Sequence, residues 1–225
     1  MTIQNTIKCV IFDCDGVLID SELISARILI EELANIGVHY DHEYVHRNFL
    51  GRSWVKVAAE VRYAHQIDLD DAFESNYRIK LLKAFETELS AMHGVKSVIE
   101  DLKISCCVAT SSSPRRAARS LTIAGLQAYF GDKVFTASEV ANGKPAPDLF
   151  QHAAAKMGVK PENCLVIEDS LPGVQAALAA EMTVLRFMGG SHLLGRMQES
   201  KTEWPDVEHF DKWENFFSIA PDLKK

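Results

Sequence analysis

The stretch Cys9-Val10-Ile11-Phe12-Asp13-Cys14-Asp15-Gly16 decides the fold of this sequence. The residues up to Phe12 are apolar, with β-branched and aromatic side chains, a pattern typical of a short buried strand. Residues two apart in an extended chain project to the same side, so Asp13 and Asp15 are expected to face one crevice. Gly16 permits a sharp exit from the strand. Because ligands bind beyond the carboxyl ends of strands in open α/β sheets, the stretch predicts a ligand site at a sheet edge.

The two aspartates indicate a bound cation. Two carboxylates this close raise each other's proton affinity unless they share a cation, and oxygen ligands favour Mg²⁺. A pair of ordinary turn aspartates is the alternative, because Asp and Gly are common in turns. A calcium-binding loop is excluded by its spacing. Its glycine stands sixth and its twelfth residue is a bidentate Glu, whereas here Gly16 stands fourth and Ile24 twelfth.

Length and composition are those of an ordinary globular protein. The 225 residues, 47% of them hydrophobic, can bury a full core and leave room for one domain that carries a smaller insertion. The net charge of −7 argues against a nucleic-acid or anionic-membrane surface, where a basic face is expected. The N-terminus has no basic segment followed by a long apolar stretch, so neither a signal peptide nor a membrane span is predicted.

The cysteines predict a reducing, cytoplasmic setting. Four of the five lie in apolar runs and none forms a C-x-x-C pair. Reduced cysteines that serve as small apolar core residues have this distribution. A monomer or a weak homodimer is expected. The cysteines are Cys9, Cys14, Cys106, Cys107 and Cys164.

The pattern from residue 20 to residue 91 is helical. Apolar residues recur there at helical spacing, and no second apolar strand interrupts them. A strand-helix-strand crossover is complete in about 30 residues, so this longer stretch predicts an inserted helical cap. An insertion directly after the first strand can close over the aspartates and exclude water. We therefore expect a cap domain at 20–91 and an α/β core domain at 1–19 and 92–225.

Strand and helix alternate through the rest of the chain. Short strands are predicted at 105–109, 134–136, 164–167 and 183–187, with helices between them. Alternation of this kind predicts a doubly wound parallel sheet, Rossmann-like, with helices on both faces. The loop Gly189-Gly190-Ser191-His192 after the last of these strands is expected to be an ordinary mobile turn, and a loop that reaches the edge of the crevice is the alternative.

Polar groups follow four of the predicted strands. Because the carboxyl ends of parallel strands lie at one edge of the sheet, these groups are expected to converge on one crevice. Each has an ordinary alternative: Ser and Thr cap helices, a loop lysine is solvated, and acids complement a helix N-terminus. Together they supply a nucleophile, an acid, metal ligands, phosphate hydrogen-bond donors and a cation. The groups are Asp13 and Asp15, Thr110 and Ser111, Lys144, and Glu168 and Asp169.

Four motifs in this order resemble those of the haloacid dehalogenase superfamily. The resemblance extends from Lys8 to Phe187. It is to the branch with a helical cap after the first strand, the β-phosphoglucomutase-like and sugar-phosphate phosphatases, including the 6-phosphogluconate phosphatase type. The motifs are D-C-D-G-V-L from Asp13, V-A-T-S from Val108, K-P-A-P-D from Lys144 and V-I-E-D-S from Val166.

The resemblance implies a Mg²⁺-dependent phosphatase that acts on a small phosphorylated metabolite, a sugar or sugar-acid phosphate. Asp13 would attack phosphorus to form an aspartyl-phosphate. Asp15 would protonate the leaving alcohol and then activate the water that hydrolyses the intermediate. The phosphoryl oxygens would be held by Thr110, Ser111 and Lys144, and Mg²⁺ by Asp13, the Asp15 carbonyl, Asp169 and Glu168.

Cationic residues of the predicted cap are candidate anion contacts for the substrate. Arg52, next to Gly51, is taken as a substrate-binding residue. Solvated surface cations are the alternative, since charged residues on helices are mostly exposed. The full set is Arg47, Arg52, Lys56, Arg78 and Lys80.

A phosphomutase of the β-phosphoglucomutase type is the alternative function. The mutase branch carries a His twelve residues beyond the nucleophile and an Arg three residues after the Gly of the cap loop. Here these positions hold Ser25 and Trp54, which favours hydrolysis, although Arg52 could substitute for the cap arginine. A dehalogenase needs no metal, and the acidic Asp15 and Asp169 argue against it. A scaffold without activity would lack one of the chemical groups, and none is missing.

One position departs from the family pattern. The family commonly has Gly where this chain has Glu181, before the last predicted strand. If the backbone there has positive φ, Glu181 carries strain on the order of 1–2 kcal/mol.

Overall fold

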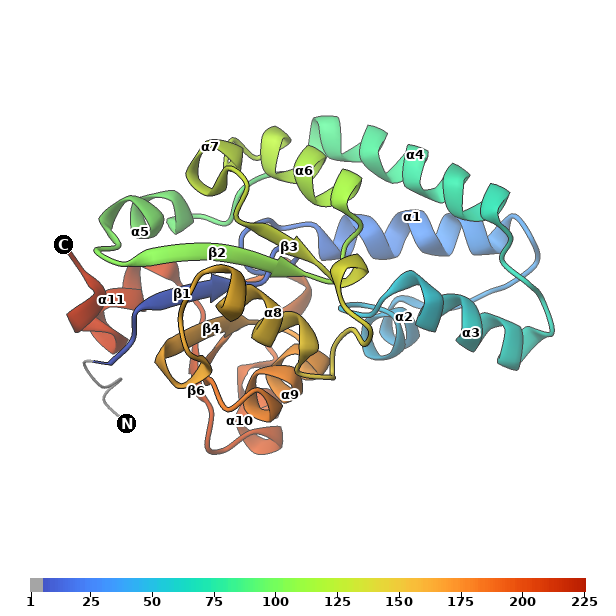
Figure 1. Cartoon of the computed structure of the whole chain (residues 1–225). Helices are drawn as coiled ribbons and strands as arrows, with labels where there is room; N and C mark the ends of the chain where they lie inside the picture. Colours follow the sequence, from blue (N-terminus) through green and yellow to red (C-terminus); the bar gives the residue numbers. More distant parts are fainter. Residues whose placement is uncertain (1–5) are drawn as a thin grey trace.

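Six parallel strands form a single sheet in the computed structural model, which describes residues 6–225. The strands are β1 (Cys9–Phe12), β2 (Ser105–Thr110), β3 (Val134–Thr136), β4 (Cys164–Glu168), β5 (Thr183–Phe187) and β6 (Glu208–Phe210). Their order across the sheet is β3-β2-β1-β4-β5-β6 (Figure 1). Phe12 of β1 lies opposite Val108 of β2 and Ile167 of β4, so β1 is central. The chain passes from one side of β1 to the other, which opens a crevice at its carboxyl end.

Helices surround this sheet in the described part of the chain. They are α1 (Glu22–Ala34), α2 (His42–Asn48), α3 (Trp54–His65), α4 (Asp71–Glu88), α5 (Val95–Asp101), α6 (Pro114–Ile123), α7 (Gln127–Phe130), α8 (Asp148–Lys156), α9 (Leu171–Ala179), α10 (Met197–Glu203) and α11 (Phe216–Ile219). Short 3-10 turns lie at Ala137–Glu139, Pro161–Asn163, Ser191–Leu193, Trp213–Asn215 and Pro221–Leu223.

The two faces of the sheet carry separate hydrophobic clusters. Successive side chains of a strand point to opposite faces, so β1 contributes to both. Val10 and Phe12 pack with residues of α5, α6, α7 and α11. Cys9 and Ile11 pack with residues of α8 and α9 on the other face. The doubly wound, Rossmann-like parallel sheet with helices on both faces is thus confirmed.

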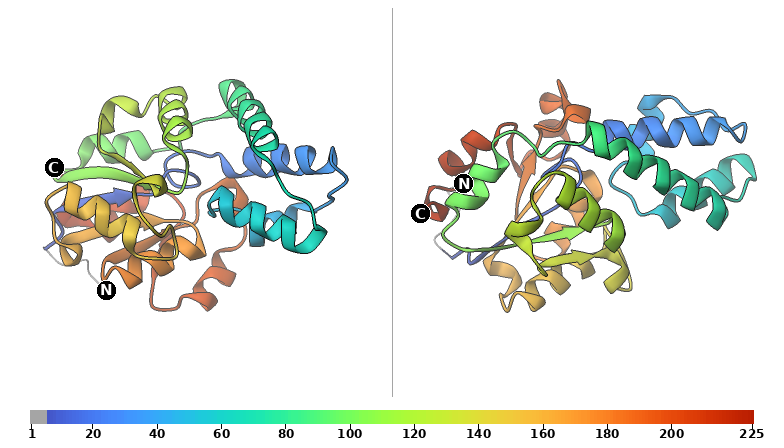
Figure 2. Two further views of the ribbon diagram at one scale, coloured as in Figure 1. Left: turned by 45° about the vertical axis from the view of Figure 1, so that its right-hand side comes forward. Right: turned by 90° about the horizontal axis from the view of Figure 1, so that it is seen from above.

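A third hydrophobic cluster lies within the segment from α1 to α4. Leu33, Val61, Leu81 and Phe85 are among its fully buried members. Both views in Figure 2 show α1 to α4 at one side of the molecule, beyond the end of the sheet. The side chain of Asp70 accepts a hydrogen bond from a backbone N–H in the first turn of α4, which fixes the start of that helix. The segment 20–91 therefore has buried apolar contacts of its own next to the crevice.

Several short elements were not predicted, among them β6, α2 and α7. The strand β6 is three residues long and lies at the edge of the sheet, where the expected alternation has too few residues to be visible. The helices α2 and α7 are seven and four residues long, too short to show a clear helical period. The strand β6 pairs with β5 and so attaches the polar tail to the sheet. Trp213, which follows β6, is 1% exposed.

Two local expectations can be compared directly with the backbone and the core. Glu181 has φ of 59°, a left-handed conformation, so the condition for strain at this position is met. All five cysteines are free and four of them are buried, as expected for reduced core cysteines. Among the described residues, no helix is both long enough and apolar enough to cross a bilayer.

Candidate active site

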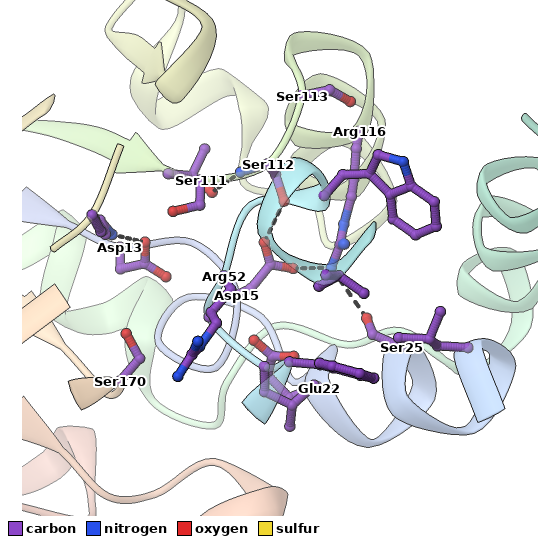
Figure 3. A pocket seen from close by; sticks show the side chains of 18 of the residues that line it. Asp13, Asp15, Glu22, Ser25, Arg52, Ser111, Ser112, Ser113, Arg116 and Ser170 are labelled. Atoms are coloured by element: carbon purple, nitrogen blue, oxygen red, sulfur yellow. Dashed lines mark hydrogen bonds and ion pairs between the residues drawn. The ribbon is translucent and has the colours of Figure 1, made fainter. Parts of the chain in front are cut away.

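A cavity of about 90 Å³ lies between the carboxyl end of the sheet and the segment α1 to α4. One wall comes from the ends of β1, β2 and β4 and from the loop before α8, and the facing wall comes from α1, α3, α4 and the loop after α2. Figure 3 shows the carboxyl groups of Asp13 and Asp15 in this cavity. The predicted residues that line it are Asp13, Asp15, Arg52, Arg78, Thr110, Ser111, Lys144 and Glu168.

Lys144 is buried between two carboxylates. Its Nζ atom lies 2.5 Å from Oδ1 of Asp13 and 2.7 Å from Oε1 of Glu168, and it donates to the carbonyl of Ala109 at 3.2 Å. Burial alone would lower the pKa of Lys144, but Asp13 and Glu168 together raise it above the ordinary lysine value. The ammonium is therefore charged and fixed in place, where it can hold a phosphoryl oxygen beside Asp13.

The third acid of the site, Asp169, completes a buried carboxylate cluster. One oxygen each of Asp13, Glu168 and Asp169 lie within 4.8 Å of one another. Burial raises the pKa of Asp13; Lys144 opposes this, and Glu168 and Asp169 add to it. Burial and then the charge of Glu168 raise the pKa of Asp169. Three buried carboxylates next to one ammonium need more positive charge, and hard oxygen donors are what Mg²⁺ prefers, so these residues fit a divalent cation.

Gly16 allows this cluster to form at close range. Its φ is 80°, and a Cβ atom there would lie 2.1 Å from Oδ2 of Asp169. Any side chain at this position would displace Asp169, so the turn after β1 depends on glycine.

Asp15 belongs to a different network from the carboxylate cluster. Ser21 donates to its Oδ1 at 2.6 Å, Ser112 to its Oδ2 at 2.7 Å, and Arg116 to Oδ1 at 2.7 Å. Burial alone would raise the pKa of Asp15, but Arg116 and the hydrogen bonds from Ser21 and Ser112 lower it overall. The side chain is thus held as an anion a short distance from Asp13, with its carboxylate separate from the cluster of three acids.

Thr110 and Ser111 lie where β2 ends, on the same wall of the cavity. Thr110 is 1% exposed, and its Oγ1 accepts a hydrogen bond from the backbone N–H of Ser112 at 3.1 Å. That bond orients the hydroxyl, whose own hydrogen is left to donate into the cavity.

Two of the predicted cationic residues line the cavity. Arg52 reaches it from the loop between α2 and α3. Arg78 of α4 donates to Oγ of Ser113 at 2.8 Å and pairs with Glu74. A contact with substrate therefore remains open to Arg52, whereas Arg78 already has two partners.

The other three predicted cationic residues do not line this cavity. Lys56 donates to the carbonyl of Lys144 at 2.7 Å and so ties α3 to the loop before α8. Arg47 and Lys80 form ion pairs with carboxylates of the segment α1 to α4. Those pairs are Arg47 with Glu43, and Lys80 with Glu32.

Comparison with known proteins identifies the family of the chain. The sequence profile of haloacid dehalogenase-like hydrolases matches residues 7–181. The chain belongs to the haloacid dehalogenase-like hydrolase family. As a haloacid dehalogenase-like hydrolase with phosphatases among its relatives, it is an enzyme of the phosphoric monoester hydrolase class.

Three similar proteins define its place in the family. The chain is 32% identical over 190 residues to 6-phosphogluconate phosphatase of Escherichia coli, covering 84% of this chain and 86% of that protein. A haloacid dehalogenase-like protein of Agrobacterium tumefaciens has a solved structure with TM-score 0.78 and 30% identity, covering 95% of this chain and 97% of that one. A putative β-phosphoglucomutase of Thermotoga maritima gives TM-score 0.68 and 27% identity, covering 95% and 98%. The predicted branch of the family is confirmed.

Two residues next to Asp15 in this haloacid dehalogenase-like site were not predicted. Arg116 is the second of two consecutive arginines in α6, and only the structure shows which of the two faces Asp15. Glu22 is 5% exposed, lines the cavity, and has a pKa raised to about 8 by burial and then by the charge of Asp15. A helix-starting Glu ordinarily complements the helix dipole on the surface, so its position in the sequence did not indicate its burial.

The loop Gly189-Gly190-Ser191-His192 is not the mobile turn that was expected. Ser191 donates to Oδ1 of Asp20 through its backbone N–H at 3.1 Å and its hydroxyl at 2.7 Å. Nε2 of His192 lies 2.9 Å from Oδ2 of Asp169, and its side chain is 5% exposed. The loop is therefore part of the structure around the carboxylate cluster, which its Gly-rich composition obscured.

Proposed function

We propose that this chain is a Mg²⁺-dependent phosphatase that hydrolyses sugar or sugar-acid phosphates through an aspartyl-phosphate on Asp13. The observation that carries the proposal is the meeting of Asp13, Lys144 and Asp169 at one edge of the sheet. An isolated carboxylate repels a phosphate dianion, so a nucleophile of this kind needs positive charge beside it. The relative named 6-phosphogluconate phosphatase supports the substrate class.

The chemistry proceeds in two displacements. In the free protein Asp15 is an anion, so it takes up a proton before the first displacement. A carboxylate oxygen of Asp13 then forms a bond to phosphorus as the bond from phosphorus to the ester oxygen breaks, and Asp15 gives its proton to that oxygen. Water then attacks the phosphorus of the aspartyl-phosphate and loses a proton to Asp15. The bond between phosphorus and Asp13 breaks, inorganic phosphate leaves, and both side chains return to their first state.

The remaining residues bind and orient the phosphoryl group. Lys144, Thr110 and the backbone N–H of Ser111 donate to its oxygens. Mg²⁺ would be held by carboxylate oxygens of Asp13, Glu168 and Asp169 with the carbonyl of Asp15, and when bound it supplies positive charge to the phosphoryl oxygens.

The segment 20–91 is proposed as the cap domain, and 1–19 with 92–225 as the core domain. Its separate hydrophobic cluster and its position over the cavity support this division. Arg52, on the loop that faces Ser170 of the core, is proposed to contact the part of the substrate beyond the phosphate. Closure of such a segment excludes water from the reaction.

We propose that the chain acts in the cytoplasm. Free thiols in the core support a cytoplasmic location, because oxidising compartments favour disulfides. We propose that the chain acts as a monomer or a weak homodimer on a small phosphorylated metabolite. Sedimentation at several protein concentrations measures the oligomeric state.

Hydrolysis is favoured over the mutase alternative by the two positions that distinguish the branches. Ser25 donates to the carbonyl of Ser21 at 2.8 Å and accepts from Arg116 at 3.1 Å. Trp54 stacks on Tyr77 with ring centroids 5.5 Å apart. Neither side chain can take the role of the mutase His or Arg. Rapid interconversion of aldose phosphates with little phosphate released would favour the mutase instead.

The test is phosphate release from a panel of sugar phosphates, sugar-acid phosphates and phosphoglycolate. The wild-type chain is expected to release phosphate, to lose activity with a chelator and to regain it with Mg²⁺. Asp13→Asn is expected to abolish activity while the fold is kept, and Asp132→Asn on the exposed surface is the matched control. Undiminished turnover by Asp13→Asn would contradict the proposed nucleophile.

A further inference from the structure

Arg116 connects the carboxylate of Asp15 to the helices that face the core. It extends from α6, and its Nη2 atom lies 2.7 Å from Oδ1 of Asp15 and 3.1 Å from Oγ of Ser25 in α1. Its guanidinium carbon lies 5.6 Å from the ring centroid of Phe85 in α4. Figure 3 shows this guanidinium between Asp15 and Ser25. One side chain of the core thus contacts the proposed acid and two helices of the proposed cap.

The other two donors to Asp15, Ser21 and Ser112, hold its carboxylate less rigidly than Arg116 does. Ser21 and Ser112 each offer a hydroxyl, which rotates freely and can also turn away to another acceptor. The guanidinium of Arg116 is planar and donates from fixed directions, and its side chain is 18% exposed, so its surroundings fix it in place. Of the three donors, Arg116 is the one that also packs on α4.

We propose that Arg116 is a positioning residue for Asp15. It fixes the place from which Asp15 passes a proton to the leaving alcohol, and it ties that place to the position of α1 and α4. The inference rests on the proposed function, because it takes Asp15 as the acid of the first displacement.

The leaving group provides a way to measure positioning separately from stability. A sugar alkoxide is a strong base, so its bond to phosphorus breaks only as the proton from Asp15 reaches its oxygen. The p-nitrophenolate ion is weakly basic and leaves without a proton. Loss of positioning therefore slows the first displacement on a sugar phosphate and spares it on p-nitrophenyl phosphate. A purely structural defect slows the reaction of both compounds.

Arg119 on the same helix is a matched control. Its Nη2 atom lies 2.8 Å from Oε1 of Glu86 in α4. Arg119 therefore joins α6 to α4, as Arg116 does, but it does not touch Asp15. Both partners of this pair are about half exposed, with side-chain exposures of 49% and 51%. An exposed pair of this kind contributes little to stability.

The experiment compares Arg116→Met, Arg116→Lys, Arg119→Met and Asp15→Asn with the wild-type chain. Two rates are measured: phosphate release from 6-phosphogluconate, and the first-turnover burst of p-nitrophenolate after rapid mixing. For Arg116→Met we expect kcat on 6-phosphogluconate to fall about 100-fold at nearly constant KM, with the burst rate within about threefold of wild type. Asp15→Asn should show the same split, that is, a large fall in kcat on 6-phosphogluconate with a nearly unchanged burst rate on p-nitrophenyl phosphate. Arg116→Lys should recover about tenfold of the kcat that Arg116→Met loses. Arg119→Met should leave both rates within about twofold.

Other results overturn the inference. Equal losses on the two compounds, or no loss on either, would show that Arg116 does not position Asp15. If Arg116→Met does not fold by circular dichroism, Arg116→Lys must show a loss on 6-phosphogluconate that is larger than its loss on p-nitrophenyl phosphate. If Asp15→Asn shows the split and Arg116→Met does not, Arg116 is not a positioning residue, and the proposed function is unaffected. Absence of the split in Asp15→Asn shows that Asp15 is not the acid, and the proposed function loses that step too.

Discussion

Nε2 of His192 lies 2.9 Å from Oδ2 of Asp169, so a loop after β5 touches the acid that follows β4. The imidazole is 5% exposed and burial lowers its pKa. A neutral, buried ring at this distance restricts where the Asp169 carboxylate can move. Residues that orient a metal ligand in this way commonly affect metal affinity.

His192→Ala is therefore expected to weaken Mg²⁺ binding by about tenfold. The measurement is titration calorimetry of the substrate-free chain with Mg²⁺. His93→Ala is the control, because His93 also contacts a carboxylate, that of Glu214 at 2.7 Å, but at an exposed position. Unchanged affinity in His192→Ala would show that Asp169 is oriented without the imidazole.

Lys144→Met should strongly destabilise the chain. The substitution leaves Asp13 and Glu168 buried without their shared cation, and breaking a buried ion pair from one side costs about 3–5 kcal/mol. Urea unfolding in the absence of Mg²⁺ measures the change in the free energy of unfolding. Lys160→Met removes an exposed pair with Glu162 and should change it by less than about 1 kcal/mol. A small effect of Lys144→Met would mean that the ammonium contributes little to the stability of the folded chain.

Glu22 should make stability depend on pH. Its pKa rises from 4.5 to about 8 on folding, so the folded chain binds the extra proton. The free energy of unfolding then falls as pH rises from about 4.5 to about 8, where the buried carboxyl must ionise. Glu22→Gln removes this loss and should gain about 2–4 kcal/mol over wild type at pH 8.5, and almost nothing at pH 4. Chemical unfolding at both pH values tests this, and an equal difference at both would contradict a raised pKa.

Glu181→Gly should stabilise the chain. Glu181 has φ of 59°, a conformation that glycine adopts without the strain of a side chain. The expected gain is about 1 kcal/mol, seen as a higher melting temperature. Ala180→Gly, at the neighbouring residue with φ of −82°, should lower it. A lower melting temperature for Glu181→Gly would show that another contact of the glutamate outweighs the strain.

The sequence was sufficient to predict which residues lie at the carboxyl edge of the sheet. Asp13, Lys144 and Asp169 follow elements with clear apolar patterns, and parallel strands bring such positions together whatever the detail of packing. The structure brings Asp13 and Lys144 together with Thr110 and Ser111 around one cavity, and Asp169 lies in the carboxylate cluster with Asp13.

The hydrogen-bond partners of individual side chains could not be predicted from the sequence. Ser21 stands at the N-cap position before α1, but its hydroxyl donates to Asp15 and not to the helix. Arg116 has the same sequence signal as Arg115 and differs only in the direction that it faces. His192 lies in a loop whose glycines suggested mobility, while its contact with Asp169 depends on where β5 ends.

Detection of a phosphoryl group on Asp13 during turnover is the most direct test of the proposed chemistry. The wild-type chain is mixed with substrate and Mg²⁺, quenched in acid within the first turnover, digested and analysed by mass spectrometry. A phosphorylated peptide containing Asp13, absent from Asp13→Asn, is the expected result. Phosphate release at the full rate with no label on that peptide, or with the label on another residue, would contradict it.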